Sequence, residues 1–451
     1  EKAVMVPQSL AKEYVTCYVF DHDNSALCTL NASDEELAPT LRWDDGNYPW
    51  GYYQFAHLFV QRSTSHAVLT LRTVNTLLAI GLIGAIIALA DSGLKRAISV
   101  AVTVAWLPMG VYFVAGMNPS SWAMTGTFAF AAGLLAATRS VGPRRVGLIA
   151  CALAGAVLAC TSRADSAFFL FVVTVALAFA VPLSRRIIPE AVLACVASVV
   201  GIWVMARTNV AASHLASGNE LEGYSLSHVL WLNVSSLPSY LRGFVGHSIG
   251  PGWNDVSYRG TVSYGATLVV FALLCWSLRS RSWRKALSAI TVAGAITGVP
   301  VVIGLRGHFN NVLTYQPRYM LPLFAVFMLM LLAPSPARAD NGGRHVGSEA
   351  FCLPTSIAGR VATGLVAALW ALTNARALYL VIERYAFGRT QHGYPIDLAT
   401  RNLSAGNEWW WPTAPIGPMT VWVVGALAGF VAIALAAYLW GGVTRERLQD
   451  H

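Results

Sequence analysis

The sequence predicts an all-α integral membrane protein. Its 451 residues are 55% hydrophobic and only 12% charged, and its mean hydropathy is +0.54, far from the balance of a water-soluble globule. Apolar runs of roughly 20 residues, the length that crosses the hydrocarbon core of a bilayer, recur along the chain. Lys and Arg gather in alternate connections between these runs. Together these observations predict a bundle of membrane-spanning helices.

Hydropathy predicts eleven spans. They cover residues 70–91, 98–117, 120–138, 147–162, 166–182, 189–206, 262–278, 286–304, 318–333, 358–380 and 418–441. The fourth and fifth spans are short and flank the polar sequence Thr161-Ser162-Arg163-Ala164-Asp165. They form either a hairpin with a polar tip or two helices broken around a buried polar site.

The basic residues orient these spans, because Lys and Arg accumulate in cytoplasmic loops. Six basic clusters fall on one side: Lys95 and Arg96; Arg139, Arg144 and Arg145; Arg185 and Arg186; Arg279, Arg281, Arg284 and Lys285; Arg338 and Arg344; Arg445 and Arg447. The net charge of +9 therefore reflects topology and does not indicate a nucleic-acid partner. We expect the chain to start outside the cytoplasm and its C-terminus to lie inside.

No apolar run precedes the first predicted loop, residues 1–69. We therefore expect a signal peptide or, in preference, a first membrane helix upstream of this sequence, which would bring the bundle to twelve helices. The alternative is that the loop crosses the membrane unaided.

The extracytoplasmic loops are the long or chemically rich segments, and we expect them to form a cap on one bundle. The loop 1–69 precedes N-terminal helices over 70–206, and a second loop covers 207–261. Helices over 262–333 include the outer loop 305–317. A cytoplasmic connector, 334–357, is rich in Pro, Gly and Ser. The last helices, over 358–451, include the outer loop 381–417.

Two cysteines, Cys17 and Cys28, share the first loop. An oxidising outer compartment favours a disulfide between them, which would contribute about 3 kcal/mol by loop closure. A pair of free thiols is the alternative. The Cys and His spacings match no zinc site.

Several ordered motifs carry a resemblance to a known family. They are Thr16-Cys17-Tyr18-Val19-Phe20 with Cys28, Tyr48-Pro49-Trp50-Gly51-Tyr52-Tyr53, Asn118-Pro119-Ser120-Ser121-Trp122, Ser162-Arg163-Ala164-Asp165-Ser166, Gln316-Pro317-Arg318-Tyr319-Met320-Leu321-Pro322 and Trp411-Pro412. The set resembles a bacterial, actinobacterial-type family of multi-pass membrane proteins of unknown function, and that family resembles GT-C glycosyltransferases. The resemblance implies a GT-C-like bundle in the plasma membrane. It also implies transfer of a sugar from a polyprenyl-phosphate carrier to a cell-envelope glycan.

One departure concerns the start of the chain. Members of that family usually begin with a membrane helix followed by an acidic, His-containing motif, and this sequence starts beyond that point.

Inverting glycosyl transfer needs a carboxylate that deprotonates the acceptor hydroxyl. Adjacent Asp44 and Asp45 are the first candidates, either as a base or as ligands of a divalent metal such as Mg, Mn or Ca. The structural alternative is an Asx-type turn before Gly46. Asp165 is a third catalytic candidate, although an ion pair with Arg163 at membrane depth is the favoured interpretation.

The reaction also needs cations that hold the departing phosphate. The candidates lie at the predicted outer ends of spans: Arg163, Arg306, His308, Arg318 and Tyr319. For Arg318 the alternative is an anchor that reaches the bilayer surface.

Six residues are candidates for contact with the sugar or acceptor: Trp50, Tyr53, Asn118, Trp122, His247 and Trp253. The structural alternatives are an interfacial aromatic belt for the first-loop aromatics, a helix cap for Asn118 and an ordered Gly-Pro-Gly turn near His247.

A glycosyltransferase is therefore the leading functional hypothesis, with the lipid bilayer, a lipid-linked sugar and an envelope glycan as partners. The first rival is a transporter or flippase of a lipid-linked glycan, which should carry broken helices and ionisable residues deep in several spans. The second is a non-catalytic subunit of envelope assembly. The spans are nearly free of charge, and polar and aromatic residues collect in the outer loops, which favours chemistry at the membrane surface.

Overall fold

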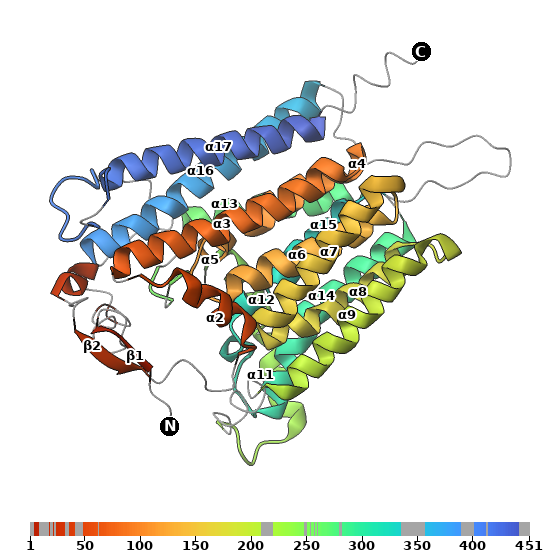
Figure 1. The fold of residues 1–451 in the computed structure, drawn as a ribbon, viewed down its shortest axis with the longest axis horizontal. Helices are drawn as coiled ribbons and strands as arrows, with labels where there is room; N and C mark the ends of the chain where they lie inside the picture. Colours follow the sequence, from red (N-terminus) through yellow and green to blue (C-terminus); the bar gives the residue numbers. More distant parts are fainter. Residues whose placement is uncertain are drawn as a thin grey trace.

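A computed structural model describes most of the chain. The described residues are 4–8, 18, 21, 24–31, 36–40, 48–61, 63–208, 220–247, 250–252, 254–256, 258, 260–278, 282–334, 357–388, 401–411 and 414–441. Long helices dominate them, and Figure 1 shows these helices running alongside one another.

Helices cover the predicted spans. They are α3 (Thr64–Leu89), α4 (Ser92–Trp106), α5 (Gly110–Val114), α6 (Ser120–Ala137), α7 (Gly142–Ser162), α8 (Ala164–Ala180), α9 (Ile188–Arg207), α13 (Thr261–Ser277), α14 (Trp283–Arg306), α15 (Leu321–Leu332), α16 (Ile357–Phe387) and α17 (Pro418–Gly441). The second span is the exception, because α4 and α5 divide it. Pro108 lies between them, and proline lacks the N–H that an α-helix needs.

Among the described residues, six helices are long and apolar enough to cross a membrane: α3, α7, α9 with the turn before it, α14, α16 and α17. Three further apolar helices, α8, α13 and α15, are shorter. The predicted class, a mainly α-helical membrane protein, is therefore supported. The count of eleven crossings stays a prediction.

Short elements gather at one end of the bundle, which we call the loop end. They include strands β1 (Val4–Pro7) and β2 (Leu37–Thr40), helices α2 (Gly51–Ala56), α11 (Leu226–Ser235) and α12 (Leu237–Arg242), and 3₁₀ turns η2 (Ala26–Asn31), η3 (His57–Phe59), η5 (Gly243–Val245), η6 (Val312–Thr314) and η7 (Pro317–Met320). The strands pair antiparallel, with Val4 opposite Thr40. This small sheet was not expected from the sequence.

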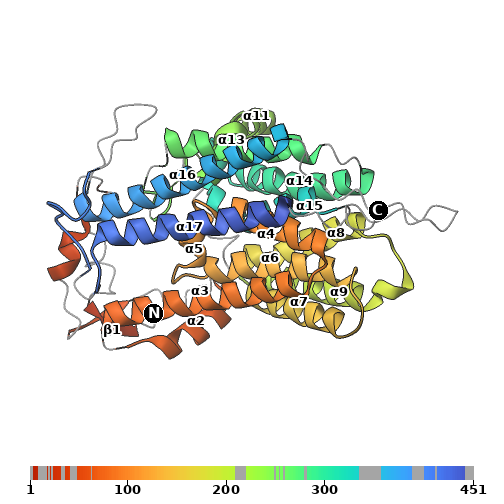
Figure 2. The same ribbon diagram turned by 90° about the horizontal axis from the view of Figure 1, so that it is seen from above.

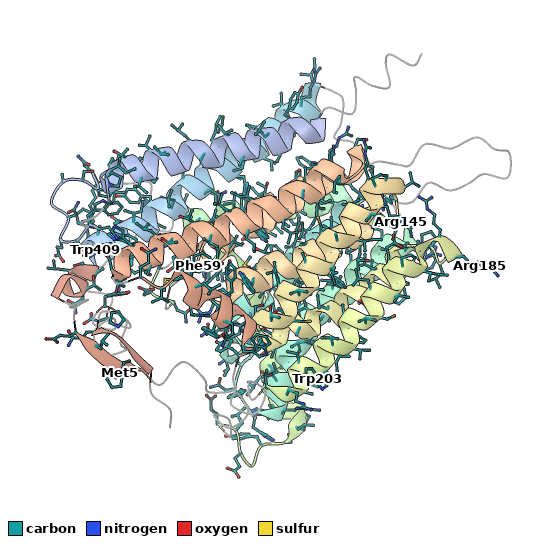
Figure 3. All side chains as sticks on the ribbon, viewed as in Figure 1. Met5, Phe59, Arg145, Arg185, Trp203 and Trp409 are labelled. Carbon is teal, nitrogen blue, oxygen red and sulfur yellow. The ribbon has the colours of Figure 1, made fainter. Side chains whose placement is uncertain are left out.

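The opposite end of the bundle is rich in arginine. Figure 3 shows Arg145 and Arg185 there, whereas Trp203 and Trp409 lie at the loop end. Arg185 begins the 3₁₀ turn η4 (Arg185–Ile187). The two predicted basic clusters that contain Arg145 and Arg185 therefore lie at the same end, as expected, but which end faces the cytoplasm stays a prediction. We call this the arginine-rich end.

Helix α6 occupies the centre of the bundle, and all but one of its residues are buried. Small residues let it approach α7 closely: a Cβ on Gly126 would lie 2.6 Å from the carbonyl oxygen of Gly155. Close backbone approach of this kind gives packing that a lipid-facing Leu cannot replace. The α6–α7 pair therefore forms a rigid base for the loop that follows α7.

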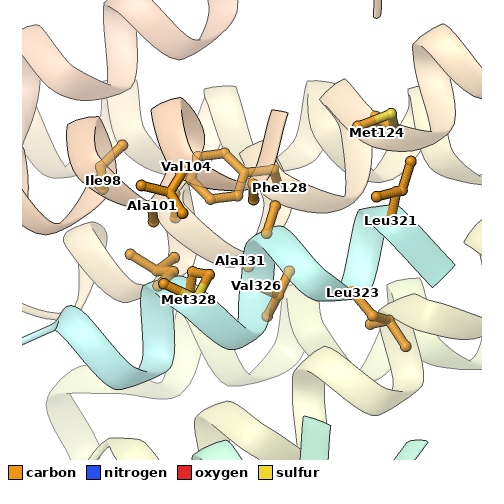
Figure 4. Close-up of a cluster of buried hydrophobic side chains, with 14 of the residues drawn as sticks. Ile98, Ala101, Val104, Met124, Phe128, Ala131, Leu321, Leu323, Val326 and Met328 are labelled. Carbon is orange, nitrogen blue, oxygen red and sulfur yellow. The ribbon is translucent and has the colours of Figure 1, made fainter. Parts of the chain in front are cut away.

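Helix α15 packs against α4, α6 and α14. Figure 4 shows part of this core, where α15 meets side chains of α4 and α6; the labelled residues are Ile98, Ala101, Val104, Met124, Phe128, Ala131, Leu321, Leu323, Val326 and Met328. Figures 1 and 2 both show two further helix pairs, α8 beside α9 and α16 beside α17. The core fixes the N-terminal end of α15, and with it the turn η7.

Candidate functional site

The break between α7 and α8 holds a buried ion pair. Arg163 has an extended backbone between the two helices, and its Nη2 lies 2.7 Å from Oδ2 of Asp165, with both side chains 11% exposed. The second link, from Nε to Oδ1, is 2.9 Å. Oδ1 also accepts the backbone N–H of Ser166 at 2.8 Å. The structural ion pair expected from the sequence is confirmed.

Tyrosines surround this ion pair. The guanidinium of Arg163 lies 4.5 Å from the ring centre of Tyr319 and 5.7 Å from that of Tyr48 in the first loop. The hydroxyl of Tyr315 donates to Oδ2 of Asp165 at 3.4 Å. Burial alone would lower the pKa of Arg163, but the charge of Asp165 outweighs it and the pKa is raised. Arg163 is therefore a permanent cation.

Arg318 reaches the same tyrosine from the turn η7. Its guanidinium lies 5.5 Å from the ring centre of Tyr319, and its Nη1 donates to the carbonyl oxygen of Gly252 at 3.0 Å. A Cβ on Gly243 would lie 2.3 Å from Pro317, so only glycine lets η5 pack this closely on η7. Arg163 and Arg318, 155 positions apart in the sequence, therefore share one aromatic ring.

A buried hydroxyl lies near the same carboxylate. Tyr240 of α12 is fully buried, and its hydroxyl has no hydrogen-bond partner among the described residues. Burial raises the pKa of Tyr240, and the negative charge of Asp165 raises it further. Burial and the charge of Asp165 likewise raise the pKa of Tyr315. Both phenols therefore stay protonated and can donate a hydrogen bond.

A second buried ion pair joins α16 to the loop 207–261, and its arginine also holds the first loop; the sequence did not reveal this contact. Arg384 of α16 lies 3.5 Å from Asp255, and these side chains are 2% and 0% exposed. Its Nη1 and Nη2 also donate to the carbonyl oxygens of Asn24, Tyr18 and Asp21, at 2.7, 2.9 and 3.0 Å. The predicted span ended at residue 380, which placed Arg384 in a loop. The absence of Gly or Pro before Gly388 could have indicated the longer helix.

Gly252 connects the two ion pairs. Its carbonyl oxygen accepts from Arg318, while a Cβ at this position would lie 2.4 Å from Oδ1 of Asp255 and 2.5 Å from the hydroxyl of Tyr385. Its φ of +70° also favours glycine. Contacts therefore run without interruption from Arg163 to Arg384 and the first loop.

Trp122 and Asn118 have structural contacts. Trp122 is buried, and its Nε1 donates to Oδ1 of Asn75 at 3.2 Å. Its ring packs edge-on against Tyr52. Oδ1 of Asn118 accepts the N–H of Ser120 at 2.8 Å, so its side chain closes a turn just before α6, whose N-cap position is Pro119. For both residues a contact with sugar stays a prediction.

Two first-loop aromatics are accessible. Trp50 is 75% exposed and Tyr53 is about as exposed as Tyr48, whose ring it meets edge-on at 6.0 Å. Tyr53 thereby lies beside the Arg163 cluster, by which we mean Arg163, Asp165, Tyr48, Tyr315 and Tyr319. The alternatives for both aromatics remain a bilayer belt or a surface for a sugar.

The remaining candidates lie apart or outside the described residues. Arg306 is exposed at the end of α14, the carbonyl of His308 accepts from Leu221 at 3.1 Å, and His247 contacts Arg242. Asp44, Asp45, Trp253 and Cys17 lie outside the described residues, and so does the predicted Cys17–Cys28 disulfide. Among the residues that are described, no group of three His, Cys, Asp or Glu side chains could hold a metal.

The family comparison covers most of the chain. Residues 4–328 match the model of a family described as predicted membrane protein (DUF2142). No curated protein and no solved structure matches the chain. The chain therefore belongs to this family of predicted membrane proteins. The motif resemblance is confirmed to that extent, while its link to GT-C enzymes and to an actinobacterial source stays a prediction.

Proposed function

We propose that this member of the DUF2142 family is a membrane glycosyltransferase that uses a polyprenyl-phosphate sugar. It would transfer the sugar to a cell-envelope glycan at the loop end, on the extracytoplasmic face of a bacterial plasma membrane. The observation that supports this most is the convergence of Arg163 and Arg318 on Tyr319. Departure of a phosphate leaves negative charge, and fixed cations stabilise that charge best in a partly dehydrated site.

The two arginines would have different roles. Arg163 makes two hydrogen bonds to the carboxylate of Asp165, so most of its positive charge is neutralised within the protein. Arg318 makes one hydrogen bond among the described residues, to a neutral carbonyl, and a guanidinium has five N–H donors. Arg318 is therefore the main phosphate ligand in this proposal. Arg163 supports it, and the Tyr240 hydroxyl adds a neutral donor.

Asp165 is a poor base because its oxygens already accept several hydrogen bonds. Oδ1 accepts from Arg163 and from the N–H of Ser166, while Oδ2 accepts from Arg163 and Tyr315. We assign it the role of positioning Arg163. The catalytic base is then Asp44 or Asp45, with a divalent metal as an alternative use of that pair. They precede Tyr48 by four and three positions, and Tyr48 contacts Arg163.

A lipid-linked donor suits this position in the bundle. The site lies at the C-terminal end of α7 and at the N-terminal ends of α8 and α15. These three helices are mainly apolar. A polyprenyl chain can lie among such helices while its phosphate reaches the arginines. Trp50 and Tyr53 offer exposed rings beside the site.

The proposal is tested with the natural full-length protein in lipid nanodiscs. The protein receives a panel of labelled polyprenyl-phosphate sugars with an envelope glycan acceptor. Label in the glycan, with release of polyprenyl phosphate, is the expected result. Movement of a lipid-linked glycan across proteoliposomes without any transfer would favour the flippase instead.

A further inference from the structure

A small hollow opens at the arginine-rich end, far from the proposed transfer site. It lies between α6, α8, α14 and α15, is partly open to its surroundings, and has a volume of about 20 Å³, which is room for a water-sized group. Polar side chains that line it include Arg139, Ser282, Lys285 and Ser288. The carbonyl of Pro334 closes one side, where it accepts from Nη2 of Arg139 at 2.8 Å.

Positive charge is concentrated around this hollow. Helix α14 begins at Trp283, and its first turn carries Arg284 and Lys285 but no acidic residue. The N-terminus of a helix already has a partial positive charge and favours an anion. Acidic residues are usually found in the first turn of a helix. Here the first turn of α14 carries the cations Arg284 and Lys285, and Arg139 also lines the hollow.

Further charged groups at this end also contact the protein. Arg284 donates to the carbonyl oxygen of Phe179 at 3.4 Å and Arg186 donates to that of Ser140 at 2.8 Å. Asp91 is the acid that acts on Arg139, and its Oδ1 caps α4 by accepting from Leu94 at 3.0 Å. Among the described residues that line the hollow, Arg139 and Lys285 are cations and none is acidic.

Ser288 is a second, independent indication of a ligand, besides the positive charge. It is fully buried, it lines the hollow, and its hydroxyl has no hydrogen-bond partner among the described residues. A hydroxyl in a helix usually bonds the carbonyl four residues earlier, as Thr291 of the same helix does to Leu287 at 2.9 Å. Burying a polar group without a partner is costly. An anion oxygen in the hollow would accept this hydrogen bond.

We propose that this hollow receives one oxygen of a phosphate group that sits at its opening, carried either by an anionic phospholipid of the adjacent leaflet or by free phosphate. Arg139 and Lys285 would supply the charge, and Ser288 would supply a neutral donor. Basic pockets between membrane helices suit lipid head groups. The site does not depend on the proposed transfer reaction, because it lies at the other end of the bundle.

The first measurement is thermal unfolding of the full chain in a neutral detergent. Separate samples receive phosphatidylglycerol, phosphatidylcholine, or inorganic phosphate matched in ionic strength by chloride. A ligand that binds the folded state raises the midpoint temperature. A rise with phosphatidylglycerol alone identifies a lipid head group, and a rise with inorganic phosphate identifies the free anion. No rise with either, or an equal rise with phosphatidylcholine, overturns the proposal.

Variants then locate the site. Ser288→Ala removes only the buried hydroxyl, so the protein should fold, and its affinity for the ligand found above should fall about tenfold, as expected for one charge-assisted hydrogen bond. Arg139→Gln and Lys285→Gln should weaken binding further. Arg185→Gln is the matched control, because it removes one charge from an exposed position at the same end. Unchanged binding by Ser288→Ala and Arg139→Gln, or equal weakening by Arg185→Gln, would refute this location.

Discussion

The guanidinium of Arg384 lies 3.5 Å from the carboxylate of Asp255, with both groups buried, and the same guanidinium holds three carbonyl oxygens of the first loop. One side chain therefore fastens that loop to α16. Because the first loop also supplies Tyr48 to the Arg163 cluster, this attachment helps to shape the loop end.

Arg384→Gln should be strongly destabilising. It removes the Arg384 guanidinium from the buried carboxylate of Asp255, and loss of one member of a buried pair costs about 3–5 kcal/mol. The midpoint of thermal unfolding in detergent should fall, and limited proteolysis should cut the first loop faster. Arg360→Gln, an exposed position in the same helix, is the control and should behave as the natural chain. Equal stability of the two variants would show that Arg384 does not anchor the loop.

Asp165→Asn should separate a positioning role from a catalytic one. Removing this charge leaves Arg163 buried without compensation, so stability should fall by about 3 kcal/mol or more. Asp44→Asn and Asp45→Asn should leave stability nearly unchanged, while at least one of them abolishes sugar transfer. Thermal unfolding and the transfer assay are measured on the same preparations. Full activity in both of the latter variants would mean that these aspartates only form a turn.

Gly126→Ala should disrupt the contact between α6 and α7. The added Cβ would meet the backbone of Gly155 at 2.6 Å, and overpacking of this kind costs about 1–3 kcal/mol. Gly81→Ala is the matched control, because a Cβ there meets no atom within 4 Å. Thermal unfolding compares the two. If Gly126→Ala unfolds at the same temperature as the natural chain, α6 and α7 can move apart without loss of stability.

Ionisation of Tyr52 at high pH should lower the stability of the folded protein. Burial raises its pKa to about 12, although a hydrogen bond from Asn75 opposes the rise. The fold therefore favours the protonated phenol. Its contribution is complete below pH about 10, the ordinary pKa of tyrosine, and is lost as pH rises through about 12. Subtracting the tyrosinate absorbance titration of Tyr52→Phe from that of the natural chain isolates this group. Ionisation near pH 10 in the folded protein would contradict its burial.

The sequence predicted the helices well because apolar runs and one-sided basic clusters follow directly from the physics of the bilayer. The pairing of Arg163 with Asp165 was also predictable, since opposite charges at membrane depth must compensate each other. Pro108 indicated a helix break, but the apolar run around it suggested one continuous span.

Other features leave no mark in the sequence. Arg384 binds backbone carbonyls, which every residue carries, so nothing in the first loop identifies its partner. The shared contact of Arg163 and Arg318 with Tyr319 depends on how α7, α8 and α15 pack. Gly252 links the two ion pairs through its carbonyl and its missing Cβ, and neither property distinguishes it from other glycines.

Transfer by the Arg318→Ala variant is the decisive measurement for the proposed function. The variant loses one hydrogen bond to Gly252, worth about 1 kcal/mol, so it should fold. Loss of the cation at the departing phosphate should lower the rate about 10²–10³-fold. Arg185→Ala, at the arginine-rich end, should transfer sugar at the natural rate. If Arg318→Ala transfers labelled sugar from polyprenyl phosphate as fast as the natural chain does, Arg318 does not hold the phosphate and the proposed site is wrong.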